Sequence, residues 1–265
     1  MSPSLADLAG YDLGRRTVAY TDTDAMLYAL CVGAAPDELS LVYERDLRVL
    51  PTFGLGLGLW AVEQASSLGA YDRLTSLHAA QSLKVHGPLP SSGTVEMSAR
   101  VSDVWDKGSA AMIDIVVDAT PFTATYSIFL PGAGGWGGDR GPSSPRGRLD
   151  AATSEWKLPV PENLAALYRL TGDRHPVHID PDVAATYGFD RPILHGLCTL
   201  GTAALKIAEA VRAHPADLRE LSARFAAPVP LGTDVGLIAR ASDHSLDFEA
   251  HCGTDVVLAN GRATF

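Results

Sequence analysis

The chain nearly repeats its own sequence, so its fold is limited to two copies of one structural unit. The segment LYAL at 27–30 recurs as LYRL at 167–170, an offset of 140 residues (167 minus 27). GPLPSSGTVEMSARVSD at 87–103 recurs at the same offset as APVPLGTDVGLIARASD at 227–243. A Pro-Gly turn before a strand, arising twice independently, is the alternative explanation. Matches in the same order favour a duplication.

Each copy is predicted to hold a short helix, a longer helix and then several strands. In the second copy the short helix covers about 161–170 and the longer one about 196–213, where apolar residues recur at helical spacing. PTFGLGLGLW at 51–60 takes the corresponding place in the first copy. Strands are expected near 222–229, 234–242, 245–252 and 256–265. We therefore predict an α+β protein in which antiparallel sheets wrap around long helices.

Composition excludes several classes of protein. Hydrophobic residues make up 46% of the chain, enough for a substantial core, and the formal net charge is −10 with no basic block for nucleic acid. Its three cysteines are far apart and odd in number, which argues against disulfides or a thiolate zinc site and suits a reducing cytosol. The first residues do not resemble a signal peptide, and no apolar run is long enough to span a membrane. We expect a cytoplasmic protein without nucleic-acid or membrane partners.

The stretch PGAGGWGGDRGPSSPRG at 131–147 joins the two copies and holds seven glycines and three prolines. Its GAGGWG at 132–137 formally matches a G-x-G-x-x-G dinucleotide fingerprint. That fingerprint must open a helix so that the helix N-terminus can hold the pyrophosphate. GGDRGPSSP follows here and cannot begin a helix, so we predict a loop between the halves.

The segment TGDRHPVHID at 171–180 predicts a forced bend. Gly172 is a typical helix stop, and Pro176 cannot lie inside a continuing helix. Asp180 followed by proline resembles a cap at the start of a new short helix. A bend of this kind brings together side chains that a straight helix would separate.

Asp173 and His178 flank this bend. On a straight helix they would point about 140° apart, but across a bend they can converge on one water and act as a general acid–base pair. Two alternatives compete: a backbone cap with a satisfied polar histidine, and a metal site made from His175, His178 and Asp173 or Asp180. The first copy has LYALCVGAAPD in this place, without the acid or the histidine. That asymmetry favours chemistry in the second copy, and no metal is expected.

RPILHGLCTLG at 191–201 places Gly196 at the start of the predicted long helix. Unpaired backbone N–H groups at a helix start can hold a developing oxyanion, and glycine leaves room for a ligand carbonyl. An ordinary helix start is the alternative.

The stretch YRLTGDRHPVHIDPDVAATYGFDRPILHGLCTLG at 168–201 resembles the signature of the MaoC-like (R)-specific enoyl-CoA hydratases, the hydratase 2 family. That signature reads roughly Y-x-L-S-G-D-x-N-P-L-H-x-D, followed by P-I-L-H-G-L. The layout extends the resemblance to nearly the whole chain. It implies a double hotdog: a degenerate first hotdog at 1–130 that shapes an acyl pocket, a connecting loop at 131–155, and a catalytic hotdog at 156–265.

The resemblance also implies roles for particular residues. Asp173 and His178 would activate the water that adds to a trans-2-enoyl thioester, while the Gly196 N–H polarises the thioester carbonyl. His175 and His195 would shape the site.

Coenzyme A is part of the substrate that the resemblance implies, so no separate cofactor is expected. Arg191 and Lys206 are candidates for binding its phosphates, and a homodimer is expected. The rival functions are a hotdog thioesterase, which would hydrolyse the thioester, and a non-catalytic subunit that binds acyl thioesters.

This chain departs from the family signature at His175, where the family has Asn. A neutral histidine can also donate a hydrogen bond, so we expect His175→Asn to leave hydration intact or raise it. The acyl group stays open among fatty, polyketide-derived and sterol side chains, and Ala-, Gly- and Asp-rich usage suggests a bacterial source. The glycines of GLGLGLW at 54–60 would either line space for the acyl chain or pack a helix closely on the sheet.

Overall fold

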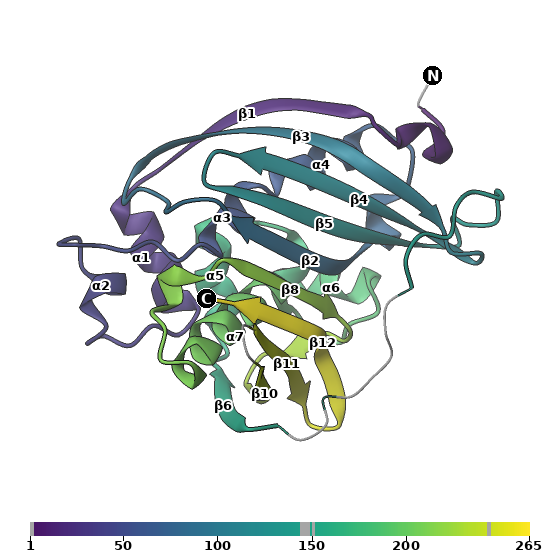
Figure 1. Cartoon of the computed structure of the whole chain (residues 1–265). Helices are drawn as coiled ribbons and strands as arrows, with labels where there is room; N and C mark the ends of the chain where they lie inside the picture. The colour runs from purple at the N-terminus through teal and green to yellow at the C-terminus, as the bar shows by residue number, and fades with distance from the viewer. Residues whose placement is uncertain (1–2, 144–148, 150–151, 243–244) are drawn as a thin grey trace.

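The computed structural model describes residues 3–143, 149, 152–242 and 245–265, so the end of the glycine-rich stretch at 144–147 lies outside the described residues. Within those ranges the strands form one ten-stranded antiparallel sheet, in the order β1-β3-β4-β5-β2-β8-β12-β11-β10-β6 (Figure 1). The first half supplies β1 (Asp12–Tyr20), β2 (Leu77–Val85), β3 (Gly93–Asp106), β4 (Ala110–Ala119) and β5 (Phe122–Pro131). The second supplies β6 (Ser154–Val160), β8 (Glu220–Phe225), β10 (Thr233–Ser242), β11 (Ser245–Cys252) and β12 (Asp255–Thr264). Short strands β7 (Ile193–Leu194) and β9 (Val229–Pro230) pair separately.

The two halves meet where β2 pairs with β8. In this pairing Ser82 lies opposite Ser222, and these two residues are separated by 140 positions (222 minus 82), the offset of the sequence repeat. Each half thus places the same residue at the junction, which is the register that a duplicated unit with a twofold relation produces. The predicted double hotdog is confirmed, with its two sheets joined edge to edge.

The second half wraps its strands around α7 (Gly196–Ala210), a helix whose inner residues are almost all buried and which contacts β6, β8 and β10. The predicted start at Gly196 is confirmed, and the helix ends three residues before the predicted end. Arg212, with φ of 55°, lies in the left-handed region just beyond the end. The four predicted strands are confirmed to within a few residues.

The first half differs because its central helix is broken into α3 (Phe53–Leu57) and α4 (Trp60–Ser67). A side-chain Cβ at Gly54 would lie 2.7 Å from the ring of Phe122, and one at Gly58 would collide with the hydroxyl of Tyr126. Both aromatic residues lie on β5. The structure therefore supports the second interpretation of these glycines, in which they let the helix pack closely on the sheet.

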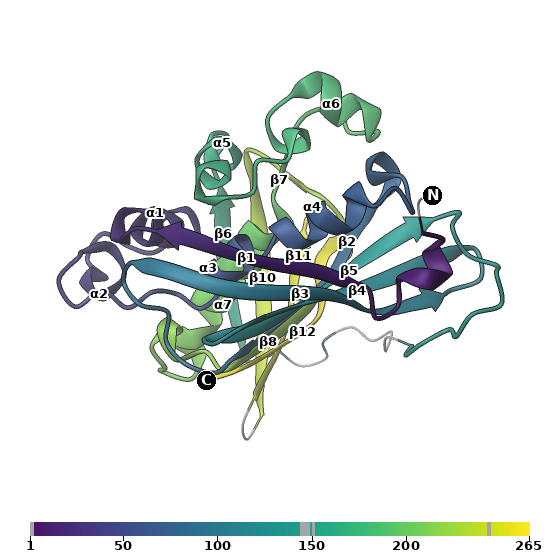
Figure 2. The same ribbon diagram turned by 90° about the horizontal axis from the view of Figure 1, so that it is seen from above.

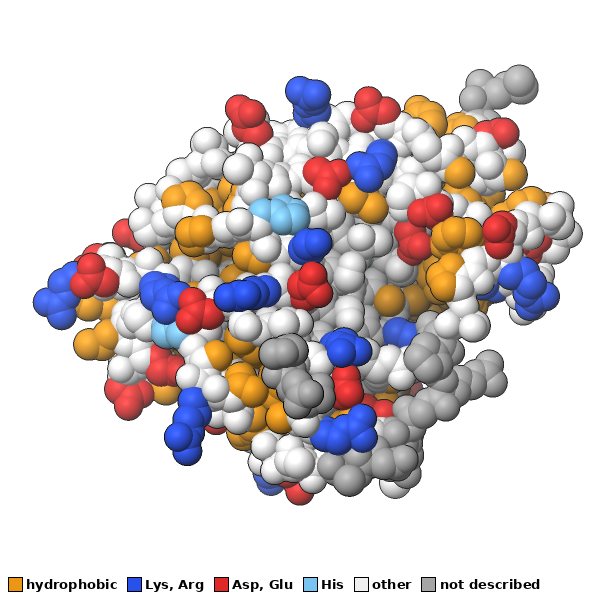
Figure 3. All heavy atoms as spheres, in the orientation of Figure 1, with side chains coloured by type: hydrophobic (Ala, Val, Ile, Leu, Met, Phe, Trp, Pro, Cys, Tyr) orange, Lys and Arg blue, Asp and Glu red, His pale blue; other side chains and the backbone are white. Residues whose placement is uncertain are grey.

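The remaining helices lie around these central ones: α1 (Asp22–Cys31), α2 (Leu39–Val42), α5 (Leu164–Tyr168) and α6 (Pro181–Thr186). Figure 2 shows α4 and α6 on the same side of β3 and β4. Charged side chains of both signs are interspersed on the face in Figure 3. Among the described residues, none of the helices has the length and apolarity needed to cross a bilayer.

The glycine-rich stretch is held by a carboxylate of the protein itself. Buried Asp106, at the end of β3, accepts hydrogen bonds from the backbone N–H groups of Gly108, Gly135 and Gly137 at 2.8 Å, and of Gly138 at 3.3 Å. These bonds lower the pKa of Asp106 to about 2. A nucleotide phosphate would need these backbone N–H groups as donors, but they already donate to Asp106. This agrees with the predicted loop between the halves.

Candidate active site

The bend at 171–180 has the predicted form. Gly172 follows the helical turn after α5 with φ of 137°, a conformation that glycine adopts without strain. His175 is extended before Pro176, with φ of −58° and ψ of 127°. The Asp180 side chain caps the first N–H groups of α6, whose first residue is Pro181. The chain thus bends between α5 and α6.

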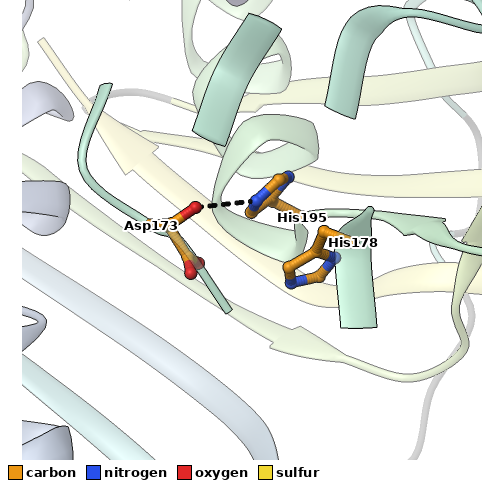
Figure 4. Close-up of side chains that lie close together, drawn as sticks. All are labelled: Asp173, His178 and His195. Carbon is orange, nitrogen blue, oxygen red and sulfur yellow. Dashed lines mark hydrogen bonds between the residues drawn. The ribbon is translucent and has the colours of Figure 1, made fainter. Parts of the chain in front are cut away.

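Three side chains converge at this bend: Asp173, His178 and His195 (Figure 4). Each offers a polar atom, and these atoms lie within 4.8 Å of one another. The imidazoles of His178 and His195 are stacked, with ring centroids 3.7 Å apart and an interplanar angle of 26°. The structure therefore brings the two predicted catalytic residues together and adds His195 behind them.

Hydrogen bonding defines which nitrogen of His178 carries the proton. Nδ1 lies 2.9 Å from the backbone carbonyl oxygen of Ile193, an atom that can only accept. Nδ1 is therefore protonated, and Nε2 has a free lone pair. Burial lowers the pKa of His178, while the charge of Asp173 and the bond to Ile193 oppose that shift. The side chain is a neutral base near neutral pH.

His195 is fully buried at the N-terminus of α7. Its Nε2 donates a hydrogen bond of 3.1 Å to the backbone carbonyl of Asp173. Burial lowers the pKa of His195 to about 3, so the ring is neutral. This residue contacts the backbone of Asp173 and one face of His178, and its role in shaping the site stays a prediction.

The same three residues satisfy the donor composition of a metal site. However, His178 Nδ1 is engaged with the carbonyl of Ile193. His195 Nε2 is also engaged with the carbonyl of Asp173. The arrangement fits proton transfer better than coordination.

A cavity of about 530 Å³ opens beside these groups. Of the predicted residues, Asp173, His175, His178 and Gly196 line it. The first half contributes apolar and polar side chains to the wall in equal number, namely Leu59, Val62, Tyr71, Leu77 and Ile128, and Glu63, Ser66, Arg73, Ser76 and His78. None of the glycines between 54 and 58 is part of this wall. The site is therefore built between the two halves.

Gly196 begins α7 and faces the cavity, so its N–H is one of the helix-start amides without an intrahelical acceptor. A Cβ at this position would lie 2.9 Å from the ring of Phe225 on β8, which also lines the cavity. Packing against Phe225 is thus a reason for glycine here that the sequence did not reveal.

Arg191 and Lys206, predicted to bind phosphates, do not line this cavity. Arg191 forms an exposed ion pair with Glu162, and Lys206 pairs with Glu209 at 2.8 Å on the same helix. Their role toward coenzyme A stays a prediction.

His78 and Tyr187 are among the cavity-wall residues that the sequence analysis missed. His78 on β2 contacts the ring of Phe225 edge-on at 4.8 Å between centroids, and burial lowers its pKa to about 4. The second copy has Leu218 at the equivalent position, so the asymmetry that pointed to Asp173 could also have pointed to His78. Tyr187, just after α6, contacts His175, and no sequence signal marked it.

Family models match both halves. A model described as MaoC like domain matches residues 146–261, and one described as MFE-2 hydratase 2 N-terminal domain matches residues 18–129.

Among curated proteins, the chain is 39% identical over 209 residues to enoyl-CoA hydratase ChsH3 of Mycobacterium tuberculosis, covering 73% of each. It is 33% identical over 283 residues to peroxisomal multifunctional enzyme type 2 of Mus musculus, covering 95% of this chain and 37% of that longer protein. A MaoC-like dehydratase from Phytophthora capsici has the same fold, with a TM-score of 0.88, 22% identity, and coverage of 98% of this chain and 97% of the other.

Proposed function

The chain belongs to the MaoC-like hydratase 2 family, and on that premise we propose that it adds water to trans-2-enoyl-CoA thioesters to give (R)-3-hydroxyacyl-CoA. The observation that supports this most directly is the position of Asp173 and His178 on the wall of one cavity, next to the first amide of α7. A neutral base, a carboxylate and an oxyanion donor are the groups that hydration requires.

The reaction follows from these positions. Water binds between Asp173 and His178, with one hydrogen directed at the free lone pair of His178 Nε2 and the other at the carboxylate. His178 takes the first proton while the oxygen bonds to Cβ of the enoyl group. The C=C electrons move to give an enolate, whose oxygen is stabilised by the Gly196 N–H.

The protonated imidazole then returns its proton to Cα, which completes the net addition of one water. Asp173 stabilises the positive charge on His178 in between, because the two groups lie within 4.8 Å. Hydroxyl and hydrogen come from the same pair of side chains, so they add to the same face of the double bond.

The acyl group would occupy the apolar part of the cavity, where Leu59, Val62 and Ile128 of the first half face residues of the second. This placement gives the first half its role of shaping the acyl pocket. Fatty-acid-like and sterol side-chain thioesters are the substrate classes we propose, within a degradative pathway. We also propose that the protein is a homodimer located in the cytoplasm, and sedimentation velocity tests the dimer.

The test is an assay of the purified protein against a panel of trans-2-enoyl-CoAs, following loss of the enoyl absorbance with chiral analysis of the products. Asp173→Asn and His178→Ala should each reduce turnover by about 100-fold or more while the protein stays folded. Exposed Asp255 and His86 provide matched controls as Asp255→Asn and His86→Ala.

Near-normal turnover in either catalytic variant would discredit the acid–base pair. Release of free thiol without loss of the enoyl absorbance would identify a thioesterase instead. Tight binding without turnover would identify a non-catalytic subunit.

A further inference from the structure

His175 and Tyr187 form a contact on the cavity wall that the hydration mechanism does not use. The Tyr187 hydroxyl lies 3.3 Å from His175 Nε2, and the two rings meet edge to face at 5.7 Å between centroids. Both residues line the cavity, and His175 also contacts the ring of His178 at 6.2 Å between centroids. The pair therefore lies beside the proposed catalytic residues.

Hydrogen bonding assigns the proton of His175. The backbone N–H of Val177 donates to His175 Nδ1 at 3.3 Å, so Nδ1 is unprotonated. Burial lowers the pKa of His175 and nearby Arg73 lowers it further, while Asp173 opposes, so the neutral form prevails at pH 7. The one proton of the neutral ring is then on Nε2, which donates it to the oxygen of Tyr187.

This assignment leaves the hydroxyl proton of Tyr187 available. Burial raises the pKa of Tyr187, so the group stays protonated at neutral pH. Within the part of the chain that the structure describes, the hydroxyl has no hydrogen-bond partner apart from His175. A donor without an acceptor on the wall of a ligand cavity is suited to a ligand oxygen.

We propose that the Tyr187 hydroxyl, oriented by His175, donates a hydrogen bond to a carbonyl oxygen of the bound acyl thioester. The ligand class rests on the proposed function. Tyr187 is the residue that contacts the substrate, and His175 is a positioning residue. Where the family signature has Asn, this chain has a histidine that orients a tyrosine.

The contact reverses one expectation from the sequence. An asparagine at position 175 has a shorter side chain and would leave Tyr187 without its support, so His175→Asn should weaken substrate binding. Asp173 is unaffected by the change, because its Oδ1 accepts from the backbone N–H of His175 at 3.2 Å. Side-chain variants at 175 therefore test the link to Tyr187 and leave this contact in place.

The experiment compares Tyr187→Phe, His175→Asn and the double variant. Steady-state kinetics with a trans-2-enoyl-CoA give kcat and KM, and calorimetry with the saturated acyl-CoA gives a Kd without turnover. Each single variant should raise KM and Kd by about 3- to 10-fold, with kcat changed by less than about twofold. The double variant should have a KM and Kd no higher than those of the single variants, because the two residues contribute through one shared contact.

Matched controls are Tyr11→Phe and His86→Asn, both at exposed positions away from the cavity, which should change neither constant. A fall in kcat with unchanged KM, an unchanged Kd in Tyr187→Phe, or fully additive effects in the double variant would overturn the proposal. If the wild type hydrates none of the enoyl-CoAs, the proposed function fails, while the Kd comparison still tests the pair.

The carbonyl oxygen can belong to the pantetheine arm or to the acyl thioester itself. The same enoyl group carried on ethanethiol, which has no amide carbonyl, separates the two. Loss of the Tyr187→Phe effect with this substrate assigns the acceptor to the pantetheine arm, and its persistence assigns it to the acyl thioester.

Discussion

His178 and His195 stack face to face, 3.7 Å between ring centroids, and each donates a ring N–H to a backbone carbonyl: His178 to Ile193 and His195 to Asp173. The stack fixes the direction of the His178 lone pair without adding charge, because both rings are neutral when buried. Burial thus keeps the base neutral and the backbone bonds orient it, while the charge of Asp173 opposes part of the pKa shift.

His195→Phe keeps an aromatic ring against His178 but removes the donor to the carbonyl of Asp173. We expect kcat to fall by about 5- to 10-fold, the value of one neutral hydrogen bond, since Asp173 is then less well placed. Stopped-flow or steady-state hydration measures this. An unchanged kcat in a folded variant would show that the donor is dispensable.

The pH dependence of kcat/KM should report His178. Because burial holds its pKa below the usual 6.5, activity should persist below that pH and fall only as the ring becomes protonated. The charge of Asp173 raises this pKa, so Asp173→Asn should move the titration of His178 to still lower pH, as followed by NMR of the imidazole. If the acid limb of the kcat/KM profile has its midpoint at or above pH 6.5, the limb does not report His178 as described.

The glycines of the first central helix give a matched series. Gly54→Ala and Gly58→Ala should each destabilise the protein by about 1–3 kcal/mol, because the new methyl meets Phe122 or Tyr126. Gly56→Ala is the control: its Cβ would lie 3.6 Å from its nearest neighbour, so stability should hold or rise by about 0.4–1 kcal/mol. Urea unfolding of the three variants decides, and equal losses at all three positions would refute the packing explanation.

Asp106→Asn should lower the melting temperature and leave kcat/KM unchanged, since the carboxylate binds loop amides and does not line the cavity beside Asp173. The pH dependence of this stabilisation follows from the pKa of Asp106 in the folded protein, which is about 2. The stabilisation is present above the unfolded value near 3.9 and is lost as pH falls toward the folded one. The melting temperature of Asp106→Asn should therefore converge with that of the wild type in acid.

Local signals were sufficient for much of the fold and for the centre of the site. A Pro-Ile-Leu-His-Gly run placed the start of α7 at Gly196, and Gly172 and Pro176 placed the bend, because helix stops and proline act over a few residues. The repeat then distinguished the half that holds Asp173 and His178.

Sequence reasoning failed where distant segments decide the outcome. Strands β1 and β6, both at the edges of the sheet, were missed. β1 is polar over much of its length and alternates weakly. β6 does alternate, with Trp156, Leu158 and Val160 turned inward, but Pro159 interrupts the run as a strand signal. The close packing of Gly54 and Gly58 depends on Phe122 and Tyr126 of β5. His78 reaches the cavity only because β2 pairs with β8, which joins residues about 140 positions apart.

The junction of β2 and β8, with Ser82 opposite Ser222, also bears on whether either half can fold alone. A half produced alone would expose one of these strands as an open edge with its backbone N–H and C=O groups unpaired. Such a fragment would recruit another strand, by self-association or aggregation. We therefore expect each half to need the other to fold, and either half expressed separately to be insoluble or to pair with another copy of itself.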